Sequence, residues 1–229
     1  MSEVAEPRDA ATVLLLRSTA EAPLEVFVMV RRTTMEFAAG VVVFPGGGVD
    51  AADSPSDSAL LTDESRDGHD VWAARMGATD LSHAASVLGA AVREVAEETG
   101  VVLSPDALGL WDAWTTPVVM PKRYRTWFFT ALLPPGQEAR ELSTESSSVS
   151  WVTPAEALDK VDAGEWDMMP PTYAAMLRLA TFASAGEVMA ATVDASVEMF
   201  LPDWTDASLR LPVWAQELAA ARGDRARWS

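Results

Sequence analysis

Apolar runs alternate with polar turns in the first fifty residues, which is the pattern of β-structure. Apolar, β-branched runs cover residues 11–16 and 24–30, and the polar segment between them contains Pro23, so a hairpin is predicted. A third apolar run, at residues 41–44, indicates a buried strand. We expect this strand to end at Pro45-Gly46-Gly47-Gly48, because neither a strand nor a helix readily continues through such a turn.

Residues 50–100 begin with a polar segment and continue into predicted helices. Residues 50–70 are rich in Asp, Ser and Ala, which predicts a solvated excursion, followed by a short helix around residues 71–76. From Asp80 onward the spacing becomes helical, with Asp80 as the N-cap and Gly100 as the C-terminal stop. The apolar residues recur at intervals of three and four: Leu81, Ala84, Leu88, Val92 and Val95.

The second half continues as a mixture of strands and helices. Strands are predicted at residues 109–115, 126–133 and 149–152, and helices at 155–162 and from Pro170-Pro171 to Leu179. We expect one domain over residues 1–229, with an insertion at about 50–79 and a helical, Trp-rich extension at about 170–229. We expect the apolar tail at 200–214 to pack on its own domain, and a homodimer contact is the alternative.

Composition narrows the range of partners. The net charge of −17 and the pI near 4.4 disfavour binding of a nucleic-acid backbone. The chain has no cysteine, which excludes disulfides, thiolate zinc sites and cysteine nucleophiles. The acidic beginning does not resemble a signal peptide, and no run approaches about 18 apolar residues. We therefore expect a cytoplasmic protein without a membrane span.

Three glutamates stand on one face of the predicted helix. Glu94, Glu97 and Glu98 are spaced i, i+3 and i+4, so we expect them to point away from the core, and their like charges repel. Either open solvent or a bound cation must relieve this repulsion, and an all-carboxylate site suits Mg²⁺ first and Mn²⁺ second. A glutamate-rich turn is usually only a solvated helix face. The glycine turn upstream favours the cation, because bare backbone can approach a metal or phosphate closely.

The sequence of residues 93–101 is Arg-Glu-Val-Ala-Glu-Glu-Thr-Gly-Val. It resembles the second half of the Nudix box, R-E-U-x-E-E-x-G-U with U aliphatic, and agrees with it at every specified position. The first half, G-x5-E, is represented by Gly47 and by Asp53 in place of glutamate. About forty residues replace the seven that normally follow this acid. This interrupted box resembles the branch of coenzyme A and acyl-coenzyme A diphosphatases, although Glu36 stands where that branch has an arginine.

The resemblance implies a fold and a set of metal ligands. The implied fold is a Nudix-type α/β/α sandwich with a mixed β-sheet and a long insertion within the box. Glu97 and Glu98 would bind Mg²⁺ or Mn²⁺ directly, and Glu94 would act as a further ligand or proton acceptor. The Gly46 carbonyl is another candidate ligand. Arg93 would brace the catalytic loop by pairing with an acid, for which Asp53 and Asp50 are the alternatives.

Several other residues are weaker candidates. Glu145 stands where several Nudix enzymes carry a general base, and a solvated loop acid is the alternative. His83 and His69 are given no role, and His83 is expected to be exposed. The cations that could contact substrate phosphates, or simply balance the acidic surface, are Arg32, Lys122, Arg123 and Arg125. The tryptophans expected in the core, with nucleobase stacking as the alternative, are Trp111, Trp114 and Trp127.

The function implied by the resemblance is metal-dependent hydrolysis of a diphosphate bond. The substrate would be a small nucleoside diphosphate linked to another moiety, as in ADP-ribose, a dinucleotide or a coenzyme A derivative. One alternative is a Nudix-fold module that binds a nucleotide without hydrolysing it, which the missing first glutamate of the box and the long insertion favour. Another is an acidic globular protein with a fortuitous match. Retention of Glu94, Glu97 and Glu98 counts against the binding module, because a pure binder has no evident need for repelling charges.

Overall fold

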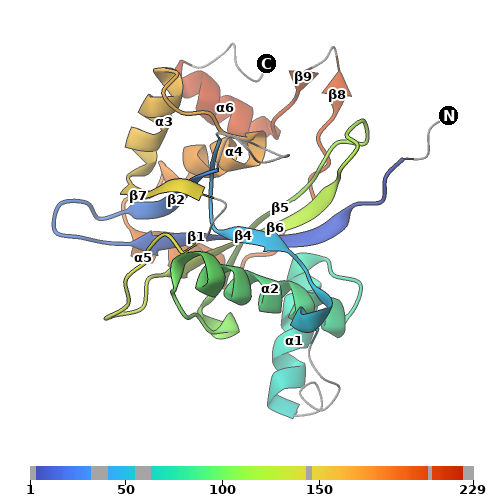
Figure 1. Cartoon of the computed structure of the whole chain (residues 1–229). Coiled ribbons are helices and arrows are strands. Elements are labelled where there is room, and N and C mark those ends of the chain that lie inside the picture. The colour runs from blue at the N-terminus through green and yellow to red at the C-terminus, as the bar shows by residue number, and fades with distance from the viewer. Residues whose placement is uncertain (1–3, 32–40, 55–62, 143–145, 206–207, 224–229) are drawn as a thin grey trace.

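A mixed β-sheet forms the centre of the molecule. The computed structural model describes residues 4–31, 41–54, 63–142, 146–205 and 208–223 (Figure 1). In this part of the chain one sheet has the strand order β3-β2-β1-β6-β5, with β4 also paired to β1 and β7 to β2. Strand β1 is parallel to β6 and antiparallel to β2 and β4. The strands are β1 (Arg8–Arg17), β2 (Glu25–Arg31), β3 (Val42–Val43), β4 (Gly46–Gly48), β5 (Gly109–Thr115), β6 (Tyr124–Leu132) and β7 (Ser146–Val152).

Helices lie on both sides of this sheet. Figure 1 shows α1 (Asp63–Met76) and α2 (Leu81–Thr99) below it, with α3 (Pro154–Asp162), α4 (Pro170–Leu179) and α6 (Val213–Arg222) above. Helix α5 (Ala185–Thr192) packs with the helices of the upper layer. The smaller elements are η1 (Ala51–Asp53), η2 (Pro105–Ala107) and the hairpin of β8 (Trp204–Thr205) and β9 (Ser208–Leu209). The predicted α/β/α sandwich with a mixed sheet is therefore confirmed.

Strand β1 supplies both hydrophobic cores. Leu14 and Leu16 belong to the cluster under α3 and α4, whereas Val13 and Leu15 belong to the cluster over α2, and all four are fully buried. A strand covered on both faces needs no polar positions. This explains why the centre of β1, from Val13 to Leu16, is a continuous apolar run rather than an alternating one.

Helix α2 forms as its sequence predicts. The Asp80 side chain accepts the His83 backbone N–H at 2.8 Å, which caps the first turn. Gly100 ends the helix in the left-handed conformation, with φ of 75°. Leu88 and Val95 face the sheet and are buried. The cap, the period and the stop thus agree, and they fix the rotation of the helix about its axis.

The glycine turn is a strand, which corrects our expectation that no strand could continue there. Gly46 to Gly48 pair with β1 as β4. An ideal Cβ on Gly46 would lie 2.4 Å from the Ala11 carbonyl oxygen and 2.6 Å from the Thr12 Cα. Only a residue without a side chain allows the two backbones to approach this closely.

The helical content was underestimated. Helix α1 begins at Asp63, well before the predicted 71–76, and α5 and α6 were predicted only as unspecified parts of the helical extension at about 170–229. The sequence of α1 is largely polar, so its apolar period is weak. In α5 the buried residues are Ala185, Val188 and Thr192, which are too small or too polar to give a clear hydrophobic stripe.

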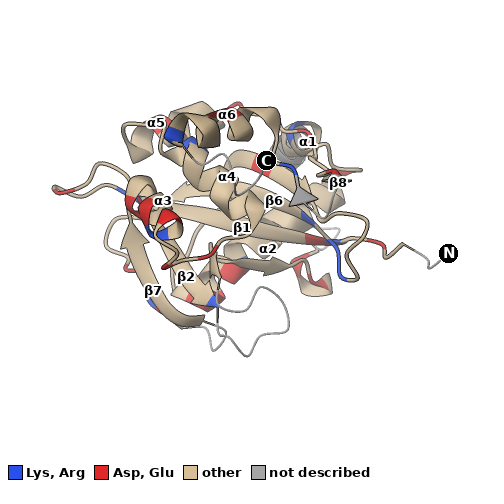
Figure 2. Cartoon of the chain, turned by 90° about the horizontal axis from the view of Figure 1, so that it is seen from above, with Lys and Arg blue, Asp and Glu red and all other residues tan. Residues whose placement is uncertain are grey.

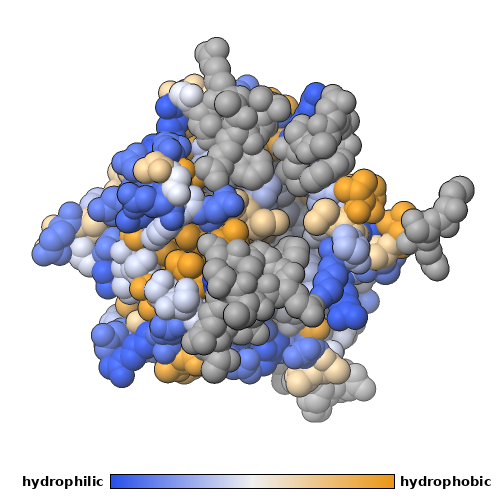
Figure 3. Space-filling model, turned by 45° about the horizontal axis from the view of Figure 1, so that its top comes forward, coloured by the Kyte–Doolittle hydropathy of each residue, from blue (hydrophilic) through white to orange (hydrophobic). Residues whose placement is uncertain are grey.

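The C-terminal tail packs on its own chain, as expected. The Phe200 N–H donates to the Ala113 carbonyl at 2.8 Å, and the Thr115 N–H donates to the Phe200 carbonyl at 2.8 Å. Leu211 is buried in the same cluster as Leu14. On the face in Figure 3, hydrophobic side chains lie in several groups separated by hydrophilic ones. The homodimer contact therefore stays a prediction.

Charged residues are spread over the molecule. In Figure 2, acidic residues lie on several elements, and α3 is prominent among them. None of the described helices has the length and apolar character needed to cross a membrane.

Candidate active site

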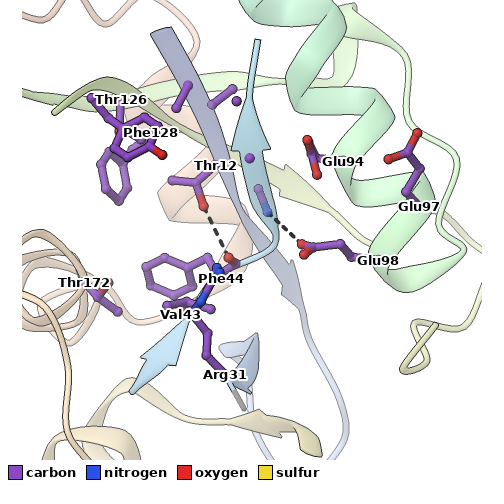
Figure 4. Close-up of a pocket in the computed structure, with 16 residues that line it drawn as sticks. Thr12, Arg31, Val43, Phe44, Glu94, Glu97, Glu98, Thr126, Phe128 and Thr172 are labelled. Carbon is purple, nitrogen blue, oxygen red and sulfur yellow. Dashed lines mark hydrogen bonds between the residues drawn. The ribbon is translucent and has the colours of Figure 1, made fainter. Parts of the chain in front are cut away.

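A cavity of about 500 Å³ opens where β1, β4 and β6 meet helix α2. The glutamates of α2 lie on one side of β4, and Phe44, Phe128 and Thr172 lie on the other (Figure 4). The residues that line it are Ala10, Ala11, Thr12, Arg31, Val43, Phe44, Gly46, Gly47, Gly48, Glu94, Glu97, Glu98, Tyr124, Thr126, Phe128 and Thr172. The structure therefore brings the three predicted glutamates and the predicted Gly46 into one site.

Glu98 is the most buried of the three glutamates. Its residue is only 8% exposed, and its Oε2 accepts the Gly46 backbone N–H at 2.8 Å. We expected all three carboxylates to point away from the core, so the burial of Glu98 is a correction. The reason is that Glu98 stands close to β4, whose glycine backbone supplies a hydrogen-bond donor within the protein.

Glu94 lies directly against β4. An ideal Cβ on Gly47 would be 2.3 Å from the Glu94 Oε1, so the carboxylate occupies the space that a side chain at residue 47 would need. Burial raises the pKa of Glu94 above its usual value, although the hydrogen bond from Arg93 acts in the opposite direction. A carboxyl group with a raised pKa in a cavity is suited to proton transfer or to binding a cation.

Arg93 joins the 3-10 turn η1 to helix α2. Its Nε donates to the Asp53 Oδ1 at 2.7 Å and its Nη2 to the Asp53 Oδ2 at 2.9 Å, which is a bidentate pair. The Asp53 side chain is 3% exposed, whereas that of Asp50 is 74% exposed and 3.9 Å from Arg93. Of the two alternatives, Asp53 is therefore the partner.

The pKa directions of this pair agree with the geometry. Burial, the largest single effect, raises the pKa of Asp53, but the hydrogen bond from Arg93, the hydrogen bond from the Asp50 N–H and the charge of Arg93 together lower the pKa below its usual value. The hydrogen bond to Asp53 is also the main reason that the pKa of Arg93 is raised. Arg93 additionally donates to the Gly48 carbonyl at 3.0 Å and to the Glu94 Oε1 at 2.8 Å. It thus fastens the 3-10 turn, β4 and α2 to one another.

The donor set fits a hard divalent cation in its chemistry. Glu94, Glu97 and Glu98 provide carboxylate oxygens around a glycine backbone, and such ligands suit Mg²⁺ and Mn²⁺. Across the described ranges, no three acidic or histidine side chains are grouped so that they could hold a metal ion together. Glu94 and Glu97 lean toward Arg93, and Glu98 turns to the Gly46 amide.

Most of the predicted substrate cations do not reach this cavity. Lys122 and Arg123 line a separate cavity of about 270 Å³. Arg123 is buried and donates to the backbone carbonyls of Thr116 at 3.0 Å and Ala5 at 2.9 Å. Arg125 donates to the Asp9 Oδ1 at 2.7 Å. The guanidinium groups of Arg123 and Arg125 are thus engaged within the fold, and their role as substrate contacts stays a prediction. Arg32 and Glu145 lie outside the described residues.

His83 is not the exposed residue that we expected. Its side chain is 15% exposed, its Nε2 lies 3.1 Å from the Asp9 Oδ2, and its Nδ1 accepts the Thr79 N–H at 3.2 Å. The ring also packs edge-on against Trp127 at 5.2 Å. The predicted core tryptophans Trp111, Trp114 and Trp127 are buried, and none of them lines the cavity.

Sequence reasoning missed the far wall of the cavity. Arg31 was considered only as one of a pair of adjacent cations with Arg32, without a place in the site. Thr172 gave no signal, since its place depends on a tertiary contact in which the Val42 N–H donates to the Asp167 carbonyl at 2.8 Å. In the sequence, Phe44 and Phe128 look like ordinary core residues of strands. Only the structure shows that they also border a cavity.

This fold and this arrangement of glutamates define a known class of protein. The chain belongs to the Nudix family, whose NUDIX domain model matches residues 6–171. Enzymes of this family generally use divalent metal ions.

Individual relatives are more distant. "Putative nudix hydrolase 7" of Caenorhabditis elegans is 26% identical over 186 residues, which are 75% of this chain and 60% of the relative. "Acyl-coenzyme A diphosphatase NUDT19" of Xenopus laevis is 32% identical over 96 residues, which are 40% of this chain and 25% of that protein. This chain therefore spans less than two thirds of either relative.

A solved structure supports the fold. The crystal structure of a NUDIX hydrolase from Alicyclobacillus acidocaldarius superposes with a TM-score of 0.64 at 24% identity, covering 82% of this chain and 97% of that chain. At this identity the similarity establishes the shared fold alone.

Proposed function

We propose that this chain hydrolyses the diphosphate bond of a nucleoside diphosphate linked to a second moiety, using Mg²⁺ or Mn²⁺. The observation that carries the proposal is the single cavity in which Glu94, Glu97 and Glu98 meet the glycine backbone of β4. Membership of a family whose relatives are named hydrolases supports it.

In this proposal Glu97 and Glu98 hold the metal ion, with Glu94 and the Gly46 carbonyl as further ligands. When bound, the ion neutralises charge on the diphosphate and lowers the pKa of water. Arg93 positions Glu94 through their 2.8 Å hydrogen bond and is itself held by Asp53. Arg31 lines the same cavity from β2 and supplies a positive charge for the phosphates.

The proton acceptor is Glu94 or Glu145. The raised pKa of Glu94, caused by burial, favours uptake of a proton from water at the cavity. Glu145 is proposed only from its position in the sequence. Replacing each with glutamine and measuring the pH profile of kcat would distinguish them, because loss of the base removes the acidic limb of the profile.

The second moiety is proposed more broadly. ADP-ribose, a dinucleotide and a coenzyme A derivative all contain the required bond. Coenzyme A belongs in this set because the interrupted box resembles that branch and because the Xenopus relative is named an acyl-coenzyme A diphosphatase. Coenzyme A is disfavoured by Glu36, which stands where that branch has an arginine. Glu36 lies outside the described residues.

The test is turnover of ADP-ribose, diadenosine polyphosphates and coenzyme A, with and without Mg²⁺ or Mn²⁺. The Glu98→Gln variant retains an oxygen that can accept the Gly46 N–H but lacks the charge, so we expect at least a hundred-fold loss of kcat. Glu217→Gln, on the exposed surface of α6, is the matched control and should retain full activity.

A nucleotide-binding module without catalysis is the competing outcome. It would be indicated if the parent and Glu98→Gln released equal, negligible amounts of phosphate monoester while both bound nucleotides. The thermal midpoint with and without Mg²⁺ adds an independent readout, because an ion that binds only the folded state raises stability. A rise in the parent that is reduced in Glu98→Gln would support the metal site.

A further inference from the structure

The cavity is divided by charge. Its carboxylates, Glu94, Glu97 and Glu98, all come from α2 on one side of β4 (Figure 4). Beyond β4 the cavity is lined by four uncharged residues, Phe44, Thr126, Phe128 and Thr172, and by one cation, Arg31 of β2. We call the four uncharged residues the aromatic wall. A ligand that fills the whole cavity therefore meets three carboxylates at one end and mostly uncharged side chains at the other.

The sheet register explains how this wall is built. Thr126 and Phe128 stand opposite Ala10 and Thr12 in the parallel pairing of β6 with β1, so their side chains share one face. Phe128 and Phe44 belong to the hydrophobic cluster under α4, on the opposite side of the sheet from α2. The cavity thus runs from the glutamates, past the bare glycines of β4, to the other face of the sheet.

Helix α4 delivers Thr172 to this wall. The Val42 N–H donates to the Asp167 carbonyl at 2.8 Å, and Val42 forms a parallel bridge with Met168. This contact places the segment that leads into α4 beside the segment that leads to Phe44. Pro170 and Pro171 then occupy the first two helical positions, so Thr172 is the first residue of α4 that carries a backbone N–H.

The hydroxyl of Thr172 has an unusual setting. Thr172 is 6% exposed and lines the cavity, yet within the described part of the chain its side chain makes no hydrogen bond. The Thr172 oxygen is not among the fully enclosed side-chain atoms without a partner, so the hydroxyl opens onto the cavity. By contrast, the Thr12 hydroxyl in the same cavity donates to the Pro45 carbonyl at 2.8 Å. The Thr172 hydroxyl is thus available to a ligand.

We propose that the aromatic wall binds the nucleobase of the substrate, and that Thr172 determines specificity by hydrogen bonding to the edge of the ring. Phe44 and Phe128 supply apolar and aromatic contacts for a planar heterocycle. The cavity volume of about 500 Å³ lies within the range of sites for nucleotide-sized ligands. The proposal rests on the proposed function for the diphosphate, which must lie at the glutamate end.

The experiment compares a substrate that has a base with one that lacks it. Thr172→Val removes the hydroxyl and keeps the shape, Thr172→Ser restores a hydroxyl, and Thr181→Val makes the same change at the exposed end of α4. We measure kcat/KM for ADP-ribose and for its base-free analogue, in which a ribose replaces the adenosine. For Thr172→Val we expect about a five-fold loss with ADP-ribose and less than a two-fold change with the base-free compound. Thr172→Ser should recover most of the loss, and Thr181→Val should match the parent.

Equal losses on both substrates, or no loss on either, would overturn the proposal while leaving diphosphate hydrolysis intact. If the parent turns over neither substrate, titration calorimetry with AMP, GMP, CMP and UMP in EDTA decides the question separately. Binding of at least one of these that is about five-fold weaker in Thr172→Val supports the aromatic wall even though hydrolysis has failed. Absence of binding, or equal binding by parent and variant, overturns it.

Discussion

Replacement of Asp53 by alanine tests the link between the box insertion and the catalytic helix. The change removes two hydrogen bonds from Arg93, of 2.7 and 2.9 Å, and one from the Asp50 N–H, of 2.7 Å. Breaking a fully buried ion pair costs about 3–5 kcal/mol. Arg93 is 24% exposed and keeps its bonds to Gly48 and Glu94, so we expect a smaller loss of about 2–3 kcal/mol in the free energy of unfolding.

Thermal unfolding provides the measurement. For a chain of this size, about 2–3 kcal/mol corresponds to a fall of roughly 8 °C in the thermal midpoint. The matched control is Asp50→Ala, which removes a carboxylate that is 74% exposed and 3.9 Å from the same guanidinium. This change should cost only about 0.5 kcal/mol. Activity should fall by about 10–100-fold in Asp53→Ala, because Arg93 would no longer hold Glu94 in place.

The pH dependence gives a further check. The folded-state pKa of Asp53 is lowered, so its contribution to stability is present above its unfolded value of 3.8 and is lost as the pH falls through the lower folded value. The difference between the parent and Asp53→Ala should therefore be constant near neutral pH and should shrink below about pH 3.8. Equal losses in Asp50→Ala and Asp53→Ala, or a gap that persists into strong acid, would refute the assignment.

Three further substitutions probe the site and its supports. Gly47→Ala should displace the Glu94 carboxylate and lower kcat by about 10²-fold in a steady-state assay, while circular dichroism shows a folded protein. Gly89→Ala places a Cβ 2.9 Å from the Asp53 carbonyl oxygen and should cost about 1–3 kcal/mol in chemical denaturation. Arg123→Ala leaves two carbonyls without their donor and should cost about 2 kcal/mol by denaturation, with kcat/KM unchanged at temperatures where the variant is folded.

Local rules were sufficient for the elements whose signals are local. Helix α2 was predicted correctly because Asp80, the apolar spacing and Gly100 all lie within one segment. The strands around β1 were predicted because a strand that is buried on both faces is apolar throughout. The box residues on α2 could be recognised as a site because their spacing alone places Glu94, Glu97 and Glu98 on neighbouring positions of one helix.

Contacts between distant segments were beyond such rules. The pairing of Gly46 to Gly48 with β1 depends on the close approach of two backbones. No pattern of residues in the sequence predicts this approach. The burial of Glu98 depends on that same strand, because β4 provides the amide that the carboxylate accepts. Thr172 reaches the cavity only because the chain before α4 pairs with Val42. In each case the missing information is the position of a second segment and not the chemistry of the first.

Gly89 allows the backbone at Asp53 to lie close to helix α2, in spite of the long insertion that follows Asp53. An ideal Cβ on Gly89 would lie 2.9 Å from the Asp53 carbonyl oxygen and 3.4 Å from the Asp53 Cβ, so the 3-10 turn packs directly on the helix surface one turn before Arg93. An aspartate is one methylene shorter than the glutamate of the usual box. The closer approach of its backbone, which only glycine at residue 89 permits, makes up for that length, and the bidentate pair with Arg93 forms at 2.7 and 2.9 Å. The long interruption therefore does not separate the two halves of the box in space. The shortened acid, which on sequence grounds favoured a binder without catalysis, no longer does so.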